Sequence, residues 1–322
     1  MLRLRLHARA LAALSLLALL LPLAPFARAL SPVQAAALRP PVSNTKSEAL
    51  LARIAVVGAS VSNGYGLAPD AQGKPVDLAR VIDSSLLLAH EPILDASSAL
   101  SFTDPVGAGQ RALRQLLERK PTLVVALDYL FWFGYGSSWG GEKERLAALE
   151  RGLEPLAKLE CPILLGDFPD MSSALEAKLR LLPPQAVPAP EVLTKLNARV
   201  GEWVKQHPNV VLVPVSKLML ALRAGEELRV AGNLWPKGRA QGLLQDDGLH
   251  TTLEGTTGLW LFAIDRLCES RPELARVAFQ TDAAAIVHKL APEAKLAAER
   301  DPSAAKGKAA PGAKGERAGK ER

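Results

Sequence analysis

The stretch Ile54-Ala55-Val56-Val57-Gly58-Ala59-Ser60-Val61-Ser62-Asn63-Gly64 decides the fold of this 322-residue chain. Its first four residues form a short apolar run of the kind that a strand buried on both faces requires. Glycine and serine end the run, and the turn-forming segment Ser62-Asn63-Gly64-Tyr65-Gly66 follows. The pattern therefore predicts a buried strand that turns into a helix, with Ser60 at the turn.

The same alternation of apolar runs and helical patterns continues along the chain. Short apolar runs predict strands at residues 54–58, 92–96, 123–127, 163–166 and 210–215. Helical patterns are found at residues 76–89, 108–119, 142–159, 191–206 and 253–269. Repeated β-α units of this kind predict an α/β fold with a five-stranded parallel sheet and helices on both faces. Ligands of such folds bind beyond the carboxyl ends of the strands.

Residues 1–29 have the features of a signal peptide. Arg3, Arg5 and Arg9 precede an apolar run at residues 10–23, and Ala27-Arg28-Ala29 fits a small-x-small cleavage site. The alternative is an uncleaved membrane anchor. No later segment is apolar over the length that a membrane span requires. We therefore expect an exported protein, periplasmic or extracellular.

Between the two ends of the chain we expect one domain, at residues 51–290. Residues 30–50 are rich in Pro, Ala and Ser and predict a linker. The tail at residues 291–322 is rich in Lys, Ala and Gly and contains no aromatic residue, so it predicts disorder.

The distribution of charge argues against a nucleic-acid partner. Of the formal net charge of +6, residues 1–29 carry +4 and residues 293–322 carry +3. About −1 is therefore left for the part that folds, and a basic face for nucleic acid has no support there.

Ser60 has one functional and two structural interpretations. As a nucleophile, it would present its hydroxyl at the carboxyl end of a strand, with its own N–H free to stabilise an oxyanion. Alternatively, the serine caps a tight turn, or the glycines cradle a phosphate. The complete phosphate-loop and dinucleotide-binding motifs are absent. Gly-x-Ser-x-Gly also fails, because position 62 is serine.

Asp247-Gly248-Leu249-His250 supplies the candidate base. The chain has five histidines, and only His250 lies in a strongly patterned loop. A carboxylate three residues earlier can hold the second imidazole N–H and set its tautomer. The alternative is a structural loop at a helix entry. No Cys/His cluster is present, so neither a metal site nor another cofactor is expected.

These residues resemble the SGNH (GDSL-type) hydrolases. Residues 58–66 resemble the first block of that family, and residues 247–255 resemble its last block; Pro121-Thr-Leu-Val-Val-Ala-Leu is similar to the strand before its third block. The resemblance spans about residues 51–270 and implies a flavodoxin-like three-layer α/β/α sandwich and ester hydrolysis or acyl transfer. By position it makes Ser60 the nucleophile, His250 the base and Asp247 its partner.

The sequence departs from that family at three positions. Ala59 replaces the first-block Asp, and Ser97 lies where the second-block Gly donates a backbone N–H to the oxyanion. The third-block Asn, a side-chain donor, would fall near Phe131. The loss of one oxyanion donor lowers a rate on the order of 100- to 1000-fold. The resemblance leaves the backbone N–H groups of Ser60 and Ser97 as donors.

An aromatic cluster replaces the third block. Aromatic residues make up 5% of the chain, yet Tyr129, Phe131, Trp132, Phe133, Tyr135 and Trp139 fall within a few residues of one another. They predict either a substrate wall, with Asn63, Phe131, Trp132 and Trp235 as its candidates, or a plug of the core. Residues 225–245 are either a lid or a long surface connection.

Three functions remain open. The first is an exported serine esterase acting on a small-molecule or carbohydrate ester. The others are a catalytically impaired protein that binds a carbohydrate or an envelope partner, and an O-acetyltransferase. Cys161 and Cys268 would both be exported, where a disulfide is permitted but is not required by the sequence.

Overall fold

In the computed structural model, the residues described are 45–136, 140–274 and 276–297. The predicted signal peptide, residues 30–44 of the predicted linker, Trp139 and residues 298–322 of the predicted tail lie outside them.

A five-stranded parallel sheet with the order β2-β1-β3-β4-β5 forms the centre of the domain. The strands are β1 (Ile54–Val56), β2 (Leu94–Asp95), β3 (Leu123–Ala126), β4 (Ile163–Gly166) and β5 (Val210–Val213). Each coincides with a predicted strand or lies within one. The strand order reverses at β1, because the chain first adds β2 on one side and then β3 on the other. The carboxyl ends of β1 and β3 therefore border the crevice in which such folds bind ligands.

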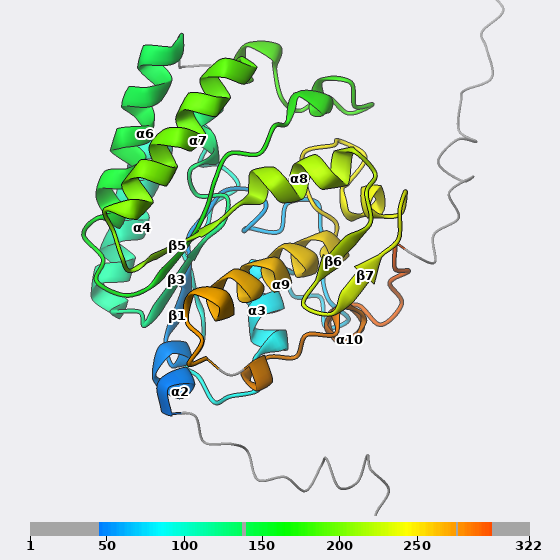
Figure 1. The fold of residues 1–322 in the computed structure, drawn as a ribbon. Coiled ribbons are helices and arrows are strands. Elements are labelled where there is room, and N and C mark those ends of the chain that lie inside the picture. The colour runs from blue at the N-terminus through cyan, green and yellow to red at the C-terminus, as the bar shows by residue number, and fades with distance from the viewer. Residues whose placement is uncertain (1–44, 137–139, 275, 298–322) are drawn as a thin grey trace, which may run out of the picture. The chain divides into compact units, whose positions relative to one another are not determined.

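Helices cover both faces of the sheet (Figure 1). One layer contains α4 (Pro105–Arg119), α6 (Glu142–Leu156) and α7 (Pro190–Lys205), and the opposite layer contains α3 (Leu78–Ser85) and α9 (Leu253–Ser270). The five predicted helices are therefore present. Together the layers form the predicted flavodoxin-like α/β/α sandwich.

Side-chain caps explain where three of these helices begin. The carboxylates of Asp77 and Asp104 and the hydroxyl of Thr252 each accept a backbone N–H from the first turn that follows, of α3, α4 and α9 respectively. The cap at Thr252, two residues after His250, fixes the start of α9 and so ties the His250 loop to a buried helix.

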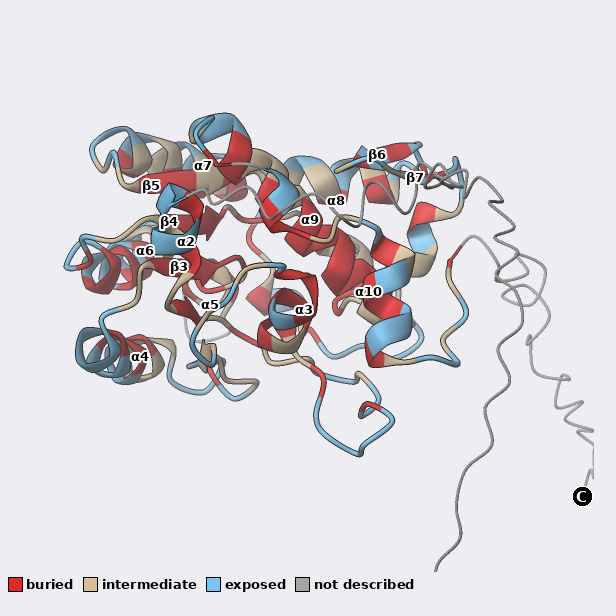
Figure 2. Ribbon diagram, turned by 90° about the horizontal axis from the view of Figure 1, so that it is seen from below, coloured by how far each residue is buried: buried red, intermediate tan, exposed pale blue. Residues whose placement is uncertain are grey.

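Buried residues concentrate in the sheet and on the helix surfaces that face it (Figure 2). All residues of β1, β3 and β4 are buried, as expected of strands between two helical layers. Trp260 of α9 is fully buried, and its indole N–H donates to the Ser85 hydroxyl of α3 over 2.7 Å. This hydrogen bond joins the two helices of one layer.

Other elements were not predicted. They are the helices α2 (Thr45–Leu51), α5 (Phe131–Gly134), α8 (Val215–Arg223) and α10 (Ala283–Leu290), the antiparallel hairpin of β6 (Leu228–Val230) and β7 (Asn233–Trp235), and the 3₁₀ turns Ser172–Leu175, Pro184–Ala186, Ala240–Leu243 and Arg276–Ala278. Most of these segments are too short for a clear period in the sequence. Residues 225–245 contain the hairpin and a 3₁₀ turn, and their role as a lid or as a long surface connection stays a prediction.

The packed domain extends beyond its expected bounds at both ends. α2 occupies part of the predicted linker, and its Ser47 is fully buried. Beyond residue 290, Ala297 is buried, and its N–H donates to Glu254 Oε2 over 2.5 Å. Composition over a window does not reveal such buried residues.

Cys161 and Cys268 are both free. Among the described helices, none has the combination of length and hydrophobicity that a membrane span demands.

Candidate active site

The turn after β1 is held by one carboxylate that follows β3. Asp128 Oδ1 accepts the backbone N–H of Ala59 (3.0 Å) and the Ser62 hydroxyl (2.6 Å). Asp128 Oδ2 accepts the backbone N–H groups of Val61 (2.9 Å) and Ser62 (3.1 Å). Four donors on both sides of Ser60 are therefore bound to one side chain, which fixes the shape of the turn.

This arrangement requires glycine at position 58 and leaves one amide unused. A Cβ on Gly58 would lie 2.1 Å from Asp128 Oδ1, so any other residue would displace the carboxylate. The Ser60 N–H, between the amides that Asp128 engages, has no acceptor among the described residues. The turn therefore keeps one free donor at the residue that carries the candidate nucleophile.

Burial raises the pKa of Asp128, and the four hydrogen bonds that it accepts oppose that rise. The surrounding groups that contact the carboxylate are donors, which suits an ionised acceptor. The buried Asp128 carboxylate therefore binds groups of the turn and is not directed at a ligand.

Ser60, His250 and Asp247 form one chain of hydrogen bonds. Ser60 Oγ lies 2.9 Å from His250 Nε2, although the two residues are 190 positions apart. His250 Nδ1 lies 2.7 Å from Asp247 Oδ2. An ionised carboxylate only accepts hydrogen bonds, so Nδ1 carries the proton, and Nε2 is left to accept the Ser60 hydroxyl. A serine, an imidazole and a carboxylate in this order form the arrangement that activates a hydroxyl as a nucleophile.

The Asp247 loop is shaped by its own hydrogen bonds. Asp247 Oδ1 accepts the backbone N–H groups of Leu249 (2.8 Å) and His250 (2.9 Å), and Gly248 takes the left-handed conformation (φ +64°) that glycine permits. Burial by itself would raise the pKa of Asp247, but the hydrogen bonds from His250 and Leu249 outweigh it, so the pKa is lowered. The carboxylate therefore stays ionised at neutral pH.

Solvent reaches these groups only in part. The exposed fractions of Ser60, His250 and Asp247 are 9%, 5% and 4%. The Tyr65 ring lies over His250, with ring centroids 4.4 Å apart. Partial burial strengthens the hydrogen bonds of this chain, because the local dielectric is lower than that of water.

The second predicted oxyanion donor is already engaged. The Ser97 N–H donates to Asp95 Oδ1 over 2.9 Å, and the Ser97 hydroxyl accepts the Asn63 side-chain N–H over 3.4 Å. In this structure the free donor at the turn is therefore the Ser60 N–H, and the role of the Ser97 N–H stays a prediction.

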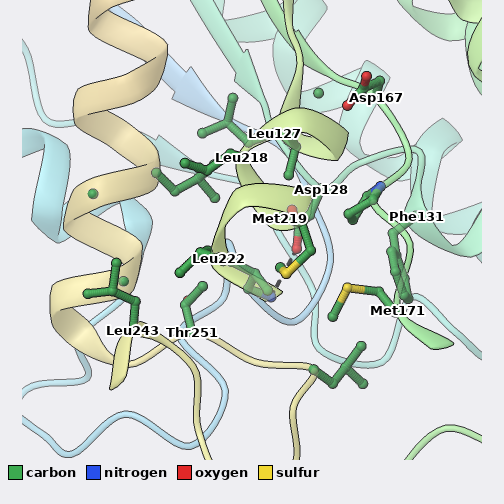
Figure 3. Close-up of a pocket in the computed structure, with 18 of the residues that line it drawn as sticks. Leu127, Asp128, Phe131, Asp167, Met171, Leu218, Met219, Leu222, Leu243 and Thr251 are labelled. Atoms are coloured by element: carbon green, nitrogen blue, oxygen red, sulfur yellow. Dashed lines mark hydrogen bonds between the residues drawn. The ribbon is translucent and has the colours of Figure 1, made fainter. Parts of the chain in front are cut away.

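A narrow apolar cavity opens beside Ser60 and has a volume of about 70 Å³. It lies between the carboxyl ends of β3 and β4, α8 and the first turns of α9 (Figure 3). Leu218, Met219 and Leu222 reach into it from α8, and Met171 and Phe131 lie on the side opposite Leu243. A cavity needs about 10–15 Å³ to hold one water molecule, so this cavity has room for a short apolar group.

Asp167 holds α8 against this cavity. The carboxylate follows β4 and accepts the backbone N–H (2.7 Å) and the hydroxyl (2.5 Å) of Ser216 in the first turn of α8. Burial raises the pKa of Asp167, against the effect of these two hydrogen bonds. The polar groups of Asp167 are thus satisfied within the protein, and the interior of the cavity stays apolar.

The predicted substrate-wall residues are divided by the fold. Phe131 and Trp235 line the apolar cavity with Ser60, and the Trp235 indole N–H donates to the buried Glu254 over 2.7 Å. Trp132 lines a second cavity, which is bordered by α4, and Asn63 lines neither the apolar cavity nor this second one. Phe131 stacks on Tyr135 at 4.3 Å between ring centroids, so part of the aromatic cluster also fills the core.

Sequence reasoning missed Asp128 and the apolar side chains of α8. The position of Asp128 at the end of an apolar run was visible, but its partners are 66 to 69 positions away. Among the described residues, no group of three or more His, Cys, Asp or Glu side chains has an arrangement suited to a metal ion.

Neither a protein-family model nor a curated protein matches the sequence. Among solved structures, the chain is similar to a lipase/acylhydrolase from Enterococcus faecalis, with 18% identity, a TM-score of 0.43, and 68% of this chain and 96% of that chain covered. It is also similar to a protein from Bacteroides fragilis assigned as an acylhydrolase, with 15% identity, a TM-score of 0.39, and 68% and 88% covered. We infer function from the geometry of the site itself.

Replacement of Asp128 by Asn is expected to loosen the Ser60 turn. The amide keeps one acceptor oxygen and directs an NH₂ group at backbone donors, so buried N–H groups lose their partner. The free energy of unfolding should fall by about 2–4 kcal/mol, since each unsatisfied buried donor costs about 1–3 kcal/mol. Urea unfolding followed by circular dichroism measures the change.

Asp77→Asn is the matched control for this experiment. Asp77 accepts the Arg80 N–H as the cap of α3, and Asn caps a helix about as well as Asp does. Equal stability of the two variants would contradict the role given to Asp128.

Proposed function

We propose that the protein is a serine esterase that cleaves carboxylic esters through an acyl-enzyme. The single observation that supports this most strongly is the hydrogen-bonded chain from Ser60 Oγ to His250 Nε2 (2.9 Å) and from His250 Nδ1 to Asp247 (2.7 Å). A structural serine does not need a buried imidazole whose other nitrogen is held by a carboxylate.

In the first half of the reaction, Ser60 Oγ bonds to the acyl carbon while its proton moves to His250 Nε2. The carbonyl electron pair moves onto the oxygen, which the free Ser60 N–H can stabilise. When the pair returns, the bond to the alcohol oxygen breaks, and that oxygen takes the proton from Nε2. The ionised Asp247 stabilises the imidazolium formed between these steps.

In the second half, water replaces the alcohol. Its oxygen bonds to the acyl carbon while His250 Nε2 takes one of its protons. The bond to Ser60 Oγ then breaks, and this oxygen recovers its proton from Nε2. A carboxylic acid leaves, and the site returns to its starting state.

The apolar cavity beside Ser60 suits the acyl chain of the ester. Its walls are Leu, Met, Val and aromatic side chains, and its two carboxylates are occupied by backbone and serine groups. An acyl chain in this cavity would be shielded from water next to the nucleophile.

Ser60→Ala and His250→Ala are each expected to lower hydrolysis of p-nitrophenyl butanoate by at least roughly 1000-fold, because nucleophile and base act as a unit. A fluorophosphonate probe should label the wild type at Ser60. It should not label Ser60→Ala, and it should label His250→Ala far more slowly. Mass spectrometry of the labelled peptide identifies the site.

Ser173→Ala and His207→Ala serve as controls. Ser173 belongs to a 3₁₀ turn, and His207 contacts Trp203 in α7, outside the chain of hydrogen bonds. If a well-folded wild type neither reacts with the probe nor turns over esters, the esterase is ruled out and the binding-protein alternative is favoured.

Met219→Ala is expected to shift the acyl preference towards longer chains, because it widens the apolar cavity at α8. Each methylene that becomes buried contributes about 0.8 kcal/mol, or about fourfold in kcat/KM. A series of p-nitrophenyl esters from acetate to decanoate measures the shift. Leu220→Ala on the same helix is the control, since Leu220 is 69% exposed. If Met219→Ala prefers the same acyl length as the wild type, the acyl chain does not bind in this cavity.

We also propose that the protein is exported and that a signal peptidase cleaves it after Ala29. Sequencing of the mature protein should begin at Leu30, and Ala29→Phe should block cleavage, because the site accepts small residues. A full-length protein that stays with the membrane fraction would instead show that residues 1–29 are an uncleaved membrane anchor.

A further inference from the structure

A second cavity, of about 180 Å³, lies on the other side of the Ser60 turn. It is bordered by the segment after β2, by α4 and by the start of the aromatic cluster. Residues that matter for its chemistry are Gly58, Ser97, Ser98, Ser101, Tyr129 and Trp132. Nothing in the mechanism above uses this cavity.

The cavity borders the turn that carries the candidate nucleophile. β1 and β2 are paired in parallel, with Val56 opposite Asp95, and the Ser98 N–H donates to the Gly58 carbonyl over 3.0 Å. Gly58 precedes Ser60 by two residues. The apolar cavity is lined by Ser60, Val61 and Asp128, and the second cavity by Gly58 and Tyr129. The two cavities therefore flank the same turn.

Two buried hydroxyl groups in this cavity have no hydrogen-bond partner among the described residues. They belong to Ser101 and Tyr129, whose exposed fractions are 9% and 8%. Burial raises the pKa of Tyr129 further above its ordinary value, so its hydroxyl keeps its proton and can donate as well as accept. A buried polar group without a partner is costly, which points to an occupant that supplies hydrogen bonds.

Helix α4 leaves room for the Tyr129 hydroxyl. A Cβ at position 109 would lie only 2.6 Å from the Tyr129 oxygen, so this hydroxyl can take its position only because residue 109 is glycine. Arg111 and Gln115 of the same helix also line the cavity, and both are exposed. Polar groups thus occur both at the buried end and at the exposed edge.

The two cavities differ in chemistry. The first is lined by Leu and Met side chains. The second combines several hydroxyl groups with the Trp132 and Phe133 rings. A polyol matches the second set, because its hydroxyls both donate and accept and its C–H groups pack on aromatic rings. An unbranched alkyl alcohol would leave the two buried hydroxyls without partners.

We propose that this second cavity binds the alcohol part of the ester, and that this part is a polyol, glycerol or a single sugar. The proposal rests on the esterase function above. The acyl chain would then lie in the apolar cavity and the polyol in the polar one, with the ester bond at Ser60 between them.

The first test compares three butanoate esters, of ethanol, glycerol and glucose, which share one acyl group. The wild type should have a higher kcat/KM for at least one polyol ester than for the ethyl ester. Ser101→Ala and Tyr129→Phe should lower kcat/KM for that ester about tenfold each, the size of one lost hydrogen bond, and leave the ethyl ester unchanged. The glycerol and glucose arms show which polyol the cavity takes.

These variants remove hydroxyls that have no described protein partner, so they should fold normally. Gln110→Ala is the control, because Gln110 lies exposed on α4 and does not line the cavity. Equal wild-type values for all three esters, or an equal loss on all three in the variants, would overturn the polyol site and leave the esterase intact.

A second test does not depend on turnover. Binding of glycerol and of methyl glucoside to the Ser60→Ala protein is measured by saturation-transfer NMR. At least one should bind, and Tyr129→Phe in that background should weaken binding about tenfold. Absence of binding for both, or binding that Tyr129→Phe does not alter, means that the cavity holds water only and overturns the proposal. Inactivity of the wild type on every ester, with no probe labelling, would instead count against the proposed function.

Discussion

The carboxylate of Asp128 is the interaction on which the candidate active site depends. It accepts hydrogen bonds from the backbone of Ala59, Val61 and Ser62 and from the Ser62 hydroxyl, and so connects the end of β3 to the turn after β1. A turn of this kind leaves several N–H groups without helix partners, and in a buried place they must be satisfied. Asp128 satisfies all but that of Ser60, which explains how a buried turn can retain one free donor.

The position of this turn follows from the order of the strands. The strand order reverses at β1, because β2 lies on one side of it and β3 on the other. The ends of β1 and β3 are therefore adjacent, while the segments that follow them run to opposite helical layers. An apolar cavity lies towards α8 and α9, and a polar cavity lies towards α4. A molecule with one apolar and one hydroxylated half matches this division. The division is a property of the topology rather than of any single residue.

Much of the fold was predictable because buried parallel strands are continuous apolar runs. Residues 163–166 were predicted as the strand that the structure contains, and the other four strands are shorter than predicted by one to three residues in total. The helix α8 was missed because the strand predicted at residues 210–215 overlaps its first residue, and the β6–β7 hairpin was missed because each of its strands has only three residues. The segments at both ends of the domain were misjudged because the buried Ser47 and Ala297 lie in stretches whose composition is typical of a linker and of a tail.

The sequence by itself determined which chemical groups are available, since Ser60 follows a buried strand and Asp247 and His250 share one loop. Local spacing is enough to form the Asp247–His250 pair, which closes over three residues. The tertiary structure alone decided that His250 meets Ser60, that Asp128 binds the turn after β1, and that Trp132 and Trp235 line different cavities. These contacts join residues far apart in the chain, and their geometry depends on how the helical layers pack on the sheet, which no local pattern encodes.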